Sequence, residues 1–189
     1  MIRRRSTILA AILLAGIPLA QGRPAAPEWA ERLVRDVRSS SFPELADKDI
    51  RVGQFTSDSD YFQARFSISR FFLGRRMRYL IRVNSGATLL TAPEEGRRAI
   101  VAHELAHLAY FAKGNRLRLL SMLRFPGKGF RKRFEKRADV EALRRGYAQG
   151  LKQYRVWLYQ HVPSGALPEK RRDYLSPDEI DALERPARK

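Results

Sequence analysis

Residues 99–112 read AIVAHELAHLAYFA, an apolar run that contains three titratable side chains. His103, Glu104 and His107 lie among alanine, valine, isoleucine, leucine and aromatic residues. A run of this length and hydrophobicity predicts a helix inside the core. A buried carboxylate is strongly destabilising without a compensating partner, so we expect a cation near Glu104.

Both ends of this helix are marked in the sequence. Residues 91–94 (TAPE) have the spacing of a capping box, with a proline tolerated in the first turn. Residues 113–114 (KG) supply a cationic last turn and a glycine, which commonly end a helix. We therefore predict a helix from Pro93 to Lys113, with the quoted stretch in its second half.

Three segments before this helix show strand patterns. The first contains Ile50, Val52 and Phe55, the second is the aromatic-rich segment Tyr61–Phe72, and the third is Met77–Val83, which alternates in hydrophobicity. Polar and glycine-containing turns at 57–60 and 74–76 separate them. These patterns predict a small antiparallel sheet of about three strands.

Helices are expected in most of the remaining chain. Residues 27–38 place apolar side chains four apart, which is typical of a short amphipathic helix. Further helices are expected at Phe130–Ala148 and Leu151–His161, and a capping box at Ser176–Glu179 begins a short C-terminal helix. Strands followed by helices indicate the α+β class.

The composition is that of a soluble globular protein. The chain has 189 residues, of which 44% are hydrophobic and 30% charged, enough for one domain with a core. We expect a single domain at residues 23–189, after an N-terminal targeting segment. The absence of cysteine excludes disulfides, thiolate metal sites and a cysteine nucleophile.

The formal charge of +17 comes mostly from arginine and is densest at residues 131–137 (RKRFEKR). Basic proteins can bind nucleic acid or an anionic membrane. No zinc knuckle, RNA-binding signature or aromatic–basic platform is present, so nucleic acid is not the expected partner. A plain solvated basic surface is the alternative to a membrane or envelope role. The leucine-rich, arginine-flanked segment Asn115–Phe125 is a candidate for contact with anionic lipid, and a core-packing helix or a loop over the site is its alternative.

The N-terminus has the three parts of a secretory signal. Three arginines precede the apolar run Ile8–Ala20, and residues 20–22 (AQG) fit the small-x-small cleavage rule. The apolar run is shorter than the about 20 residues of a membrane span. We predict a signal peptide at residues 1–22, with an uncleaved N-terminal anchor as the alternative. In both cases the protein is exported and is periplasmic, secreted or associated with the cell envelope.

The spacing of the two histidines favours a metal site. Helical residues four apart share a face, so the imidazoles of His103 and His107 can reach one ion. Glu104 points away from that line and can instead reach a water molecule on the ion, as in the His-Glu-x-x-His pattern. The alternative is that the histidines are ordinary hydrogen-bonded core residues.

A third ligand is expected from the second helix. A catalytic zinc takes three protein ligands, and only His161 remains among the histidines, so a carboxylate is the economical choice. Glu135 and Asp139 are four apart on one face, which small residues continue. Glu135 would then ligate the metal, and Asp139 would orient a ligand histidine. Their alternative is a pair of surface ion pairs with neighbouring Arg and Lys residues.

Two motifs together resemble a known enzyme family. Residues 101–107 (VAHELAH) followed by residues 134–139 (FEKRAD) resemble the gluzincin zinc metallopeptidases. In these two motifs the chain is most similar to the membrane-linked endopeptidases with a Glu-x-x-Ala-Asp helix and to the small secreted minigluzincins. The resemblance covers about Met77–Tyr147 and lacks the four-helix membrane core of the integral endopeptidases.

This resemblance implies a zincin-like helical core and one Zn²⁺ per chain. It implies His103, His107 and Glu135 as ligands, Glu104 as general base and Asp139 as the partner of a ligand histidine. It also implies that the strand near Tyr79–Asn84 holds a peptide substrate as an added strand, with Asn84 as a substrate contact.

No motif identifies the residue that stabilises the oxyanion. Tyr147, Tyr154 and His161 are the candidates in the sequence. The function expected from these observations is an exported zinc metallopeptidase, with peptides or proteins as substrates. The alternative is a catalytically inactive protein of the same fold that serves as a binding module, and other divalent ions could replace zinc.

Overall fold

The computed structural model describes residues 26–73, 76–114 and 127–185 and confirms the α+β class. The predicted signal peptide and the whole Asn115–Phe125 segment lie outside these residues. The elements run in the order α1 (Glu28–Ser41), η1 (Pro43–Leu45), β1 (Asp49–Phe55), β2 (Phe62–Phe66), α2 (Ile68–Phe72), β3 (Arg78–Asn84), η2 (Ala87–Thr91), α3 (Glu94–Lys113), α5 (Lys128–Arg144), α6 (Ala148–His161), α7 (Leu167–Asp173) and α8 (Pro177–Glu184).

The sheet is mixed, so the prediction of a purely antiparallel sheet was wrong. Its strand order is β1-β3-β2, with β3 antiparallel to β2 but parallel to β1. The prediction failed because alternation in hydrophobicity reports which residues are half-buried and not which strands are neighbours. Here β3 inserts between the two strands that precede it in the chain.

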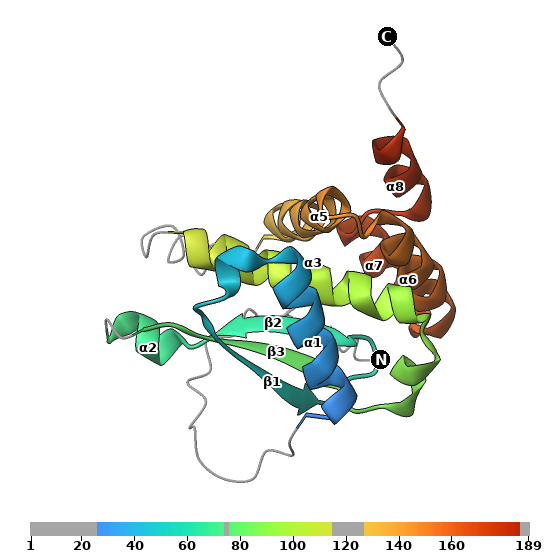
Figure 1. The fold of residues 1–189 in the computed structure, drawn as a ribbon. Helices are drawn as coiled ribbons and strands as arrows, with labels where there is room; N and C mark the ends of the chain where they lie inside the picture. The colour runs from blue at the N-terminus through green and yellow to red at the C-terminus, as the bar shows by residue number, and fades with distance from the viewer. Residues whose placement is uncertain (1–25, 74–75, 115–126, 186–189) are drawn as a thin grey trace, which may run out of the picture.

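The second predicted strand is shorter than expected. β2 ends at Phe66, and residues Ile68–Phe72 form the short helix α2 before the chain returns as β3. Aromatic residues favour strands but also occur in helices, so composition alone did not show this change. As a result, α2 projects from one end of the sheet (Figure 1).

The helices cover one face of the sheet. The covered face carries apolar side chains from all three strands, including Tyr79, Ile81 and Val83 of β3 and Phe62 of β2, all of them buried. α1 and α3 pack over this face, with α5 and α6 on the far side of α3 (Figure 1). Helix α3 is therefore central to the fold. None of the helices in the described part of the chain has the length and hydrophobicity to cross a membrane.

The predicted capping box at the start of α3 was wrong. Thr91 belongs to the preceding turn η2, where its hydroxyl donates to the Thr88 carbonyl oxygen (2.7 Å) and accepts from Trp157 Nε1 (3.0 Å). Helix α3 begins at Glu94, after Pro93 in an extended conformation and without a side-chain cap. In contrast, the capping box of α8 is confirmed: the Glu179 amide donates to Ser176 Oγ (3.1 Å), and Glu179 Oε2 accepts from the Ser176 amide (2.9 Å).

Helices α3 and α6 cross in close contact at two glycines. A Cβ added to Gly150 would overlap the Glu95 carbonyl oxygen and lie 3.0 Å from Ala99 Cβ. A Cβ added to Gly96 would lie 3.3 Å from the backbone of Tyr154. The close approach brings α6 against the helix that carries the His-Glu-x-x-His pattern, and thereby sets which α6 side chains reach the candidate site.

Candidate metal centre

Two imidazole nitrogens from α3 and one carboxylate oxygen from α5 form a nearly equilateral triangle. His103 Nε2 and His107 Nε2 are 3.1 Å apart, and each lies 3.1 Å from Glu135 Oε2. The structure therefore brings together the three side chains that the sequence suggested as ligands. His103 and His107 are buried, and the side chain of Glu135 is 17% exposed.

The triangle has the size of one face of a metal coordination tetrahedron. Zinc bonds of about 2.0–2.1 Å in tetrahedral geometry place neighbouring ligand atoms about 3.3–3.4 Å apart. The 3.1 Å edges are slightly shorter and need only a small relaxation to admit such an ion. Two imidazole nitrogens with one carboxylate oxygen are also a common donor set for catalytic zinc, so the residues fit the ion that the resemblance implies.

Asp139 fixes the ring orientation of His103. Its Oδ1 accepts from His103 Nδ1–H (2.7 Å) and from Arg155 Nη2 (2.7 Å), and its Oδ2 accepts from the Leu175 amide (2.8 Å). Asp139 is fully buried, so these three donors replace water around its charge. Because the proton of His103 is then on Nδ1, the lone pair of Nε2 faces the triangle, as a metal ligand requires.

The second histidine is held by ring packing. The imidazole of His107 stacks on Phe134, with centroids 4.3 Å apart, and Phe134 precedes Glu135 in α5. One turn of α5 therefore both orients His107 and supplies the third side chain of the triangle. The predicted small face of this helix is also present, since Ala138 and Ala142 are buried in the core.

The charges of the centre are strongly coupled in the absence of a cation. Burial lowers the pKa of His103, but the carboxylates of Asp139 and Glu135 outweigh it and raise that pKa to about 10. Burial raises the pKa of Glu135, whereas the two histidines lower it to well below its ordinary value. The carboxylates therefore remain ionised and require positive charge between them, from a proton or from a metal ion.

Glu104 lies beside the triangle and faces the sheet. It is buried, and its carboxylate accepts a hydrogen bond from the backbone N–H of Ala64 in β2. Burial raises the pKa of Glu104; His103 and His107 lower it, and Glu135 raises it again. A carboxylate with a raised pKa, next to a metal site but outside its ligand triangle, is suited to accept a proton from water.

The free edge of the sheet near the centre is β2, not β3. The Ser67 amide donates to the Arg78 carbonyl oxygen, and the Asn84 amide donates to the Tyr61 carbonyl oxygen. Ser67–Arg78 and Tyr61–Asn84 are therefore hydrogen-bonded pairs of the β2–β3 ladder. Since such pairs alternate, Phe62, Ala64 and Phe66 direct their backbone groups away from β3, toward an edge that no described strand occupies.

The expectation that the Tyr79–Asn84 strand holds the substrate was therefore wrong. β3 is the central strand and has a neighbour on both sides, which leaves no backbone groups for a further strand. The Asn84 side chain is also engaged: Nδ2 donates to the carbonyl oxygens of Ser57 (2.6 Å) and Asp60 (2.8 Å), and Oδ1 accepts from the Gly86 amide (2.9 Å). Asn84 holds the loop before β2.

A cavity of about 20 Å³ adjoins Glu104 on the α6 side. Its lining includes Glu104, Tyr154, Arg155, Lys170 and Tyr174. The volume is close to that of one water molecule. Lys170 Nζ donates to Asp60 Oδ1 (2.5 Å) at this cavity and so joins α7 to the loop before β2.

Tyr174 and Arg155 are site residues that the sequence reasoning missed. The ring of Tyr174 lies 5.8 Å from that of His103, and the guanidinium of Arg155 lies 4.4 Å from the Tyr174 centroid. The only sequence signal for Arg155 is its position directly after Tyr154, on a helix face that also carries the buried residues Leu151 and Leu158. Tyr174 follows a short helix that was not expected, so no periodicity indicated its place.

The remaining candidates from the sequence are placed differently. Tyr154 lines the cavity beside Glu104. The Tyr147 hydroxyl hydrogen-bonds to Ser41 Oγ (2.8 Å) at the end of α1. His161 Nδ1–H donates to the Trp157 carbonyl oxygen (2.8 Å), and its ring stacks on Trp157. The structure thus does not bring Tyr147 or His161 to the three side chains of the triangle.

Comparisons with known proteins do not assign the chain to a family. No protein-family model matches the chain, and searches of curated proteins and of solved structures gave no match.

Proposed function

We propose that the protein is an exported metallopeptidase in which His103, His107 and Glu135 bind one zinc ion. The single observation that carries this proposal is the 3.1 Å triangle of ligand atoms beside a buried carboxylate that is not part of it. An ion of this kind lowers the pKa of a bound water to about 7 and polarises a carbonyl group. The remaining chemistry belongs to side chains of the chain itself.

Glu104 is the general base in this proposal. Its raised pKa favours proton uptake, and its neighbours hold it beside the triangle rather than in it. It would take a proton from the attacking water and deliver it to the leaving amine. The hydrogen bond from the Ala64 amide fixes the carboxylate relative to β2. The base and the sheet edge are therefore positioned together.

The β2 edge is the proposed binding place for an extended peptide. Main-chain hydrogen bonds with Phe62, Phe66 and the Ala64 carbonyl oxygen can hold a peptide as an added strand, because these residues direct their backbone groups outward, whereas the Ala64 N–H already donates to Glu104. Such binding recognises the backbone and depends little on side chains. It also places a peptide bond next to Glu104, since Ala64 is already in contact with that carboxylate.

Tyr174 is the proposed donor to the developing oxyanion. Burial and the neighbouring carboxylate of Glu135 raise the pKa of Tyr174 well above 10, so its hydroxyl remains a donor at neutral pH. Its contact with the ring of His103 places it nearer the triangle than Tyr147 or His161. Arg155 stacks against it and fixes its ring.

Replacing Tyr174 with Phe should therefore lower kcat about 100-fold and leave zinc binding intact, because only a transition-state hydrogen bond is removed. Peptide hydrolysis and zinc titration of the purified variant measure the two effects. Tyr154→Phe is the matched control, since Tyr154 lines the same cavity but contacts Trp157 rather than His103. A Tyr174→Phe variant with unchanged kcat, or with an equal loss in both variants, would contradict this role.

Metal analysis tests the proposal as a whole. The purified wild-type chain should bind one zinc ion. His103→Ala and Glu135→Ala should each lose most of the bound zinc, because the two ligands that remain are too few to hold the ion. The controls are His161→Ala and Glu141→Ala, which remove one imidazole and one carboxylate outside the triangle. Both controls should retain the ion. Elemental analysis also identifies the ion. Equal metal content in all five proteins would refute the proposed centre.

A further inference from the structure

The connection between β2 and β3 carries two neighbouring exposed apolar side chains. Phe72 and Leu73 are 63% and 65% exposed, at the end of α2. Other exposed large apolar side chains of the described residues, such as Val156 and Leu183, are far apart in the chain. Figure 1 shows α2 projecting from one end of the sheet, away from the helices that cover it. An adjacent apolar pair in such a place indicates a contact surface.

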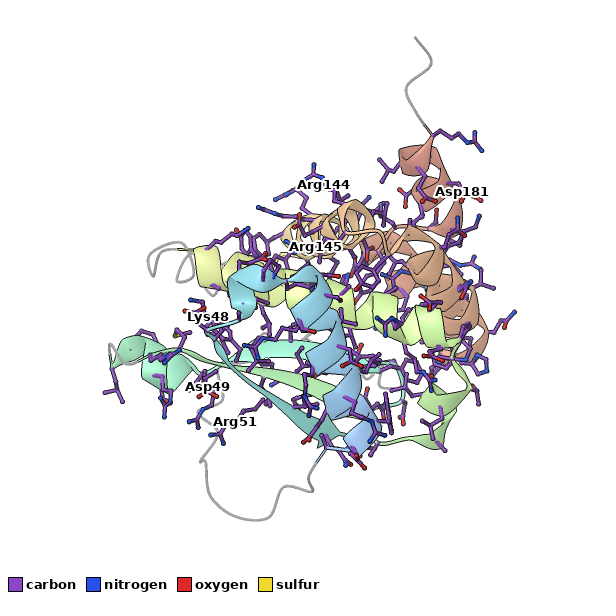
Figure 2. The ribbon with its side chains drawn as sticks, in the orientation of Figure 1. Lys48, Asp49, Arg51, Arg144, Arg145 and Asp181 are labelled. Atoms are coloured by element: carbon purple, nitrogen blue, oxygen red, sulfur yellow. The ribbon has the colours of Figure 1, made fainter. Side chains whose placement is uncertain are left out.

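Several arginines lie in the connection that carries this pair and in the sheet beside it. The face of the sheet that no described helix covers carries four of them, Arg51, Arg65, Arg78 and Arg82, and the only acidic side chain of the three strands on this face is Asp49. Asp49 is bound by Arg78 (2.7 Å) and lies 3.5 Å from Arg51. Figure 2 shows Asp49 and Arg51 on the side of the sheet that faces away from α1 and α3. The face therefore has a net positive charge at neutral pH.

Two further arginines extend this charge to the apolar pair. Arg70 lies in α2, two residues before Phe72, and Arg76 lies between Leu73 and the start of β3. Arg70 Nη1 donates to the Arg76 carbonyl oxygen (3.4 Å), so the two segments of the connection lie together. On the neighbouring η1–β1 turn, Asp47 is paired with Lys48. The apolar pair is thus bordered by the guanidinium groups of Arg70 and Arg76, and Arg76 also donates to the Asp47 carbonyl oxygen.

We propose that Phe72, Leu73 and the arginine-rich open face of the sheet dock on the surface of an anionic lipid bilayer. Apolar side chains can insert at the boundary between head groups and acyl chains, while arginines contact anionic head groups. Neither signal holds a protein stably alone, and this surface combines both. Nucleic acid would match the charge but not the exposed apolar pair. Docking does not depend on the proposed hydrolysis.

The absence of cysteine allows a direct test with a single reporter on the full chain. Leu73→Cys, labelled with an environment-sensitive fluorophore, should shift to the blue with vesicles of mixed phosphatidylglycerol and phosphatidylcholine, and lipid-borne quenchers should reduce its signal. Phosphatidylcholine vesicles alone should give little response. Val156→Cys on α6, where Val156 is 48% exposed, is the matched control and should not respond. The reporter is local, so lipid contacts of the Ile8–Ala20 run do not produce its signal.

Charge removal tests the electrostatic part. Adding Arg51→Gln and Arg76→Gln to the labelled Leu73→Cys chain should raise the half-saturating lipid concentration about 25-fold, since one arginine near an anionic surface contributes about fivefold. Arg32→Gln with Arg144→Gln removes the same charge from α1 and α5, where these side chains are 54% and 75% exposed, and should change it little. Arg144 lies on the opposite side of the molecule in Figure 2.

Three results would overturn the proposal. The first is a Leu73 reporter that responds to anionic vesicles no more than the Val156 reporter does. The second is an equal response to anionic and zwitterionic vesicles, which would leave no role for the arginines. The third is a blue shift that appears without lipid and grows with protein concentration, because this would identify a second copy of the chain as the occupant.

Discussion

A Glu104→Gln chain is expected to bind zinc as the wild type does and to lose at least about 1,000-fold in kcat, because it keeps the triangle and loses the general base. Gln conserves the size of the side chain and removes a buried charge, so the fold should persist. Initial rates of peptide hydrolysis, together with metal content of the same preparation, measure both properties.

The control for this experiment is Glu94→Gln, which changes an exposed carboxylate in the first turn of the same helix. It should leave both the rate and the metal content unchanged. Retained turnover in Glu104→Gln with a full complement of zinc would remove Glu104 from the mechanism. Loss of zinc from this variant would instead show that the carboxylate is a ligand.

Replacing Gly150 with Ala should destabilise the protein by at least about 3 kcal/mol, because its Cβ would overlap the backbone carbonyl of Glu95. The obstacle is the backbone carbonyl group of Glu95, so rotation of a side chain cannot relieve the overlap. For a chain of this size, the loss corresponds to a fall of about 6–12 °C in Tm. Thermal unfolding followed by circular dichroism measures it.

Gly165→Ala is the matched substitution, since an added Cβ there has no neighbour within 4 Å. Its effect on unfolding should lie within about 0.5 kcal/mol of zero, as for most surface changes. Equal Tm values for the two variants would show that α3 and α6 are not in the close contact described above. A loss confined to Gly150→Ala would support it.

Local signals in the sequence predicted the helices better than the sheet. The amphipathic spacing of residues 27–38 gave α1, and Ser176–Glu179 gave the start of α8, because both patterns depend on neighbours within one turn. Strand order depends instead on contacts between distant segments, such as Val52 with Ile81. That is why the parallel pairing of β1 and β3 was not foreseen.

The candidate centre follows the same division. The positions of His103, Glu104 and His107 on one helix could be read from spacing, and the Glu135–Asp139 pair from a second helix with a small face. Arg155 and Tyr174 could not, because tertiary packing alone brings α6 and the segment after α7 to this place. The proposed peptide-binding edge was assigned to β3 for a similar reason, because the identity of the edge strand depends on strand order.

The hydrogen bond from Leu175 to Asp139 has a consequence for biosynthesis. Tyr174 and Leu175 are synthesised about 70 residues after His103. A nascent chain that already contains both histidines and Glu135 still lacks the Leu175 amide that binds Asp139 and the Tyr174 ring that contacts His103. The contacts that orient His103 are therefore completed only after synthesis has passed Leu175, so a shorter nascent chain does not yet hold the proposed centre in the geometry described above.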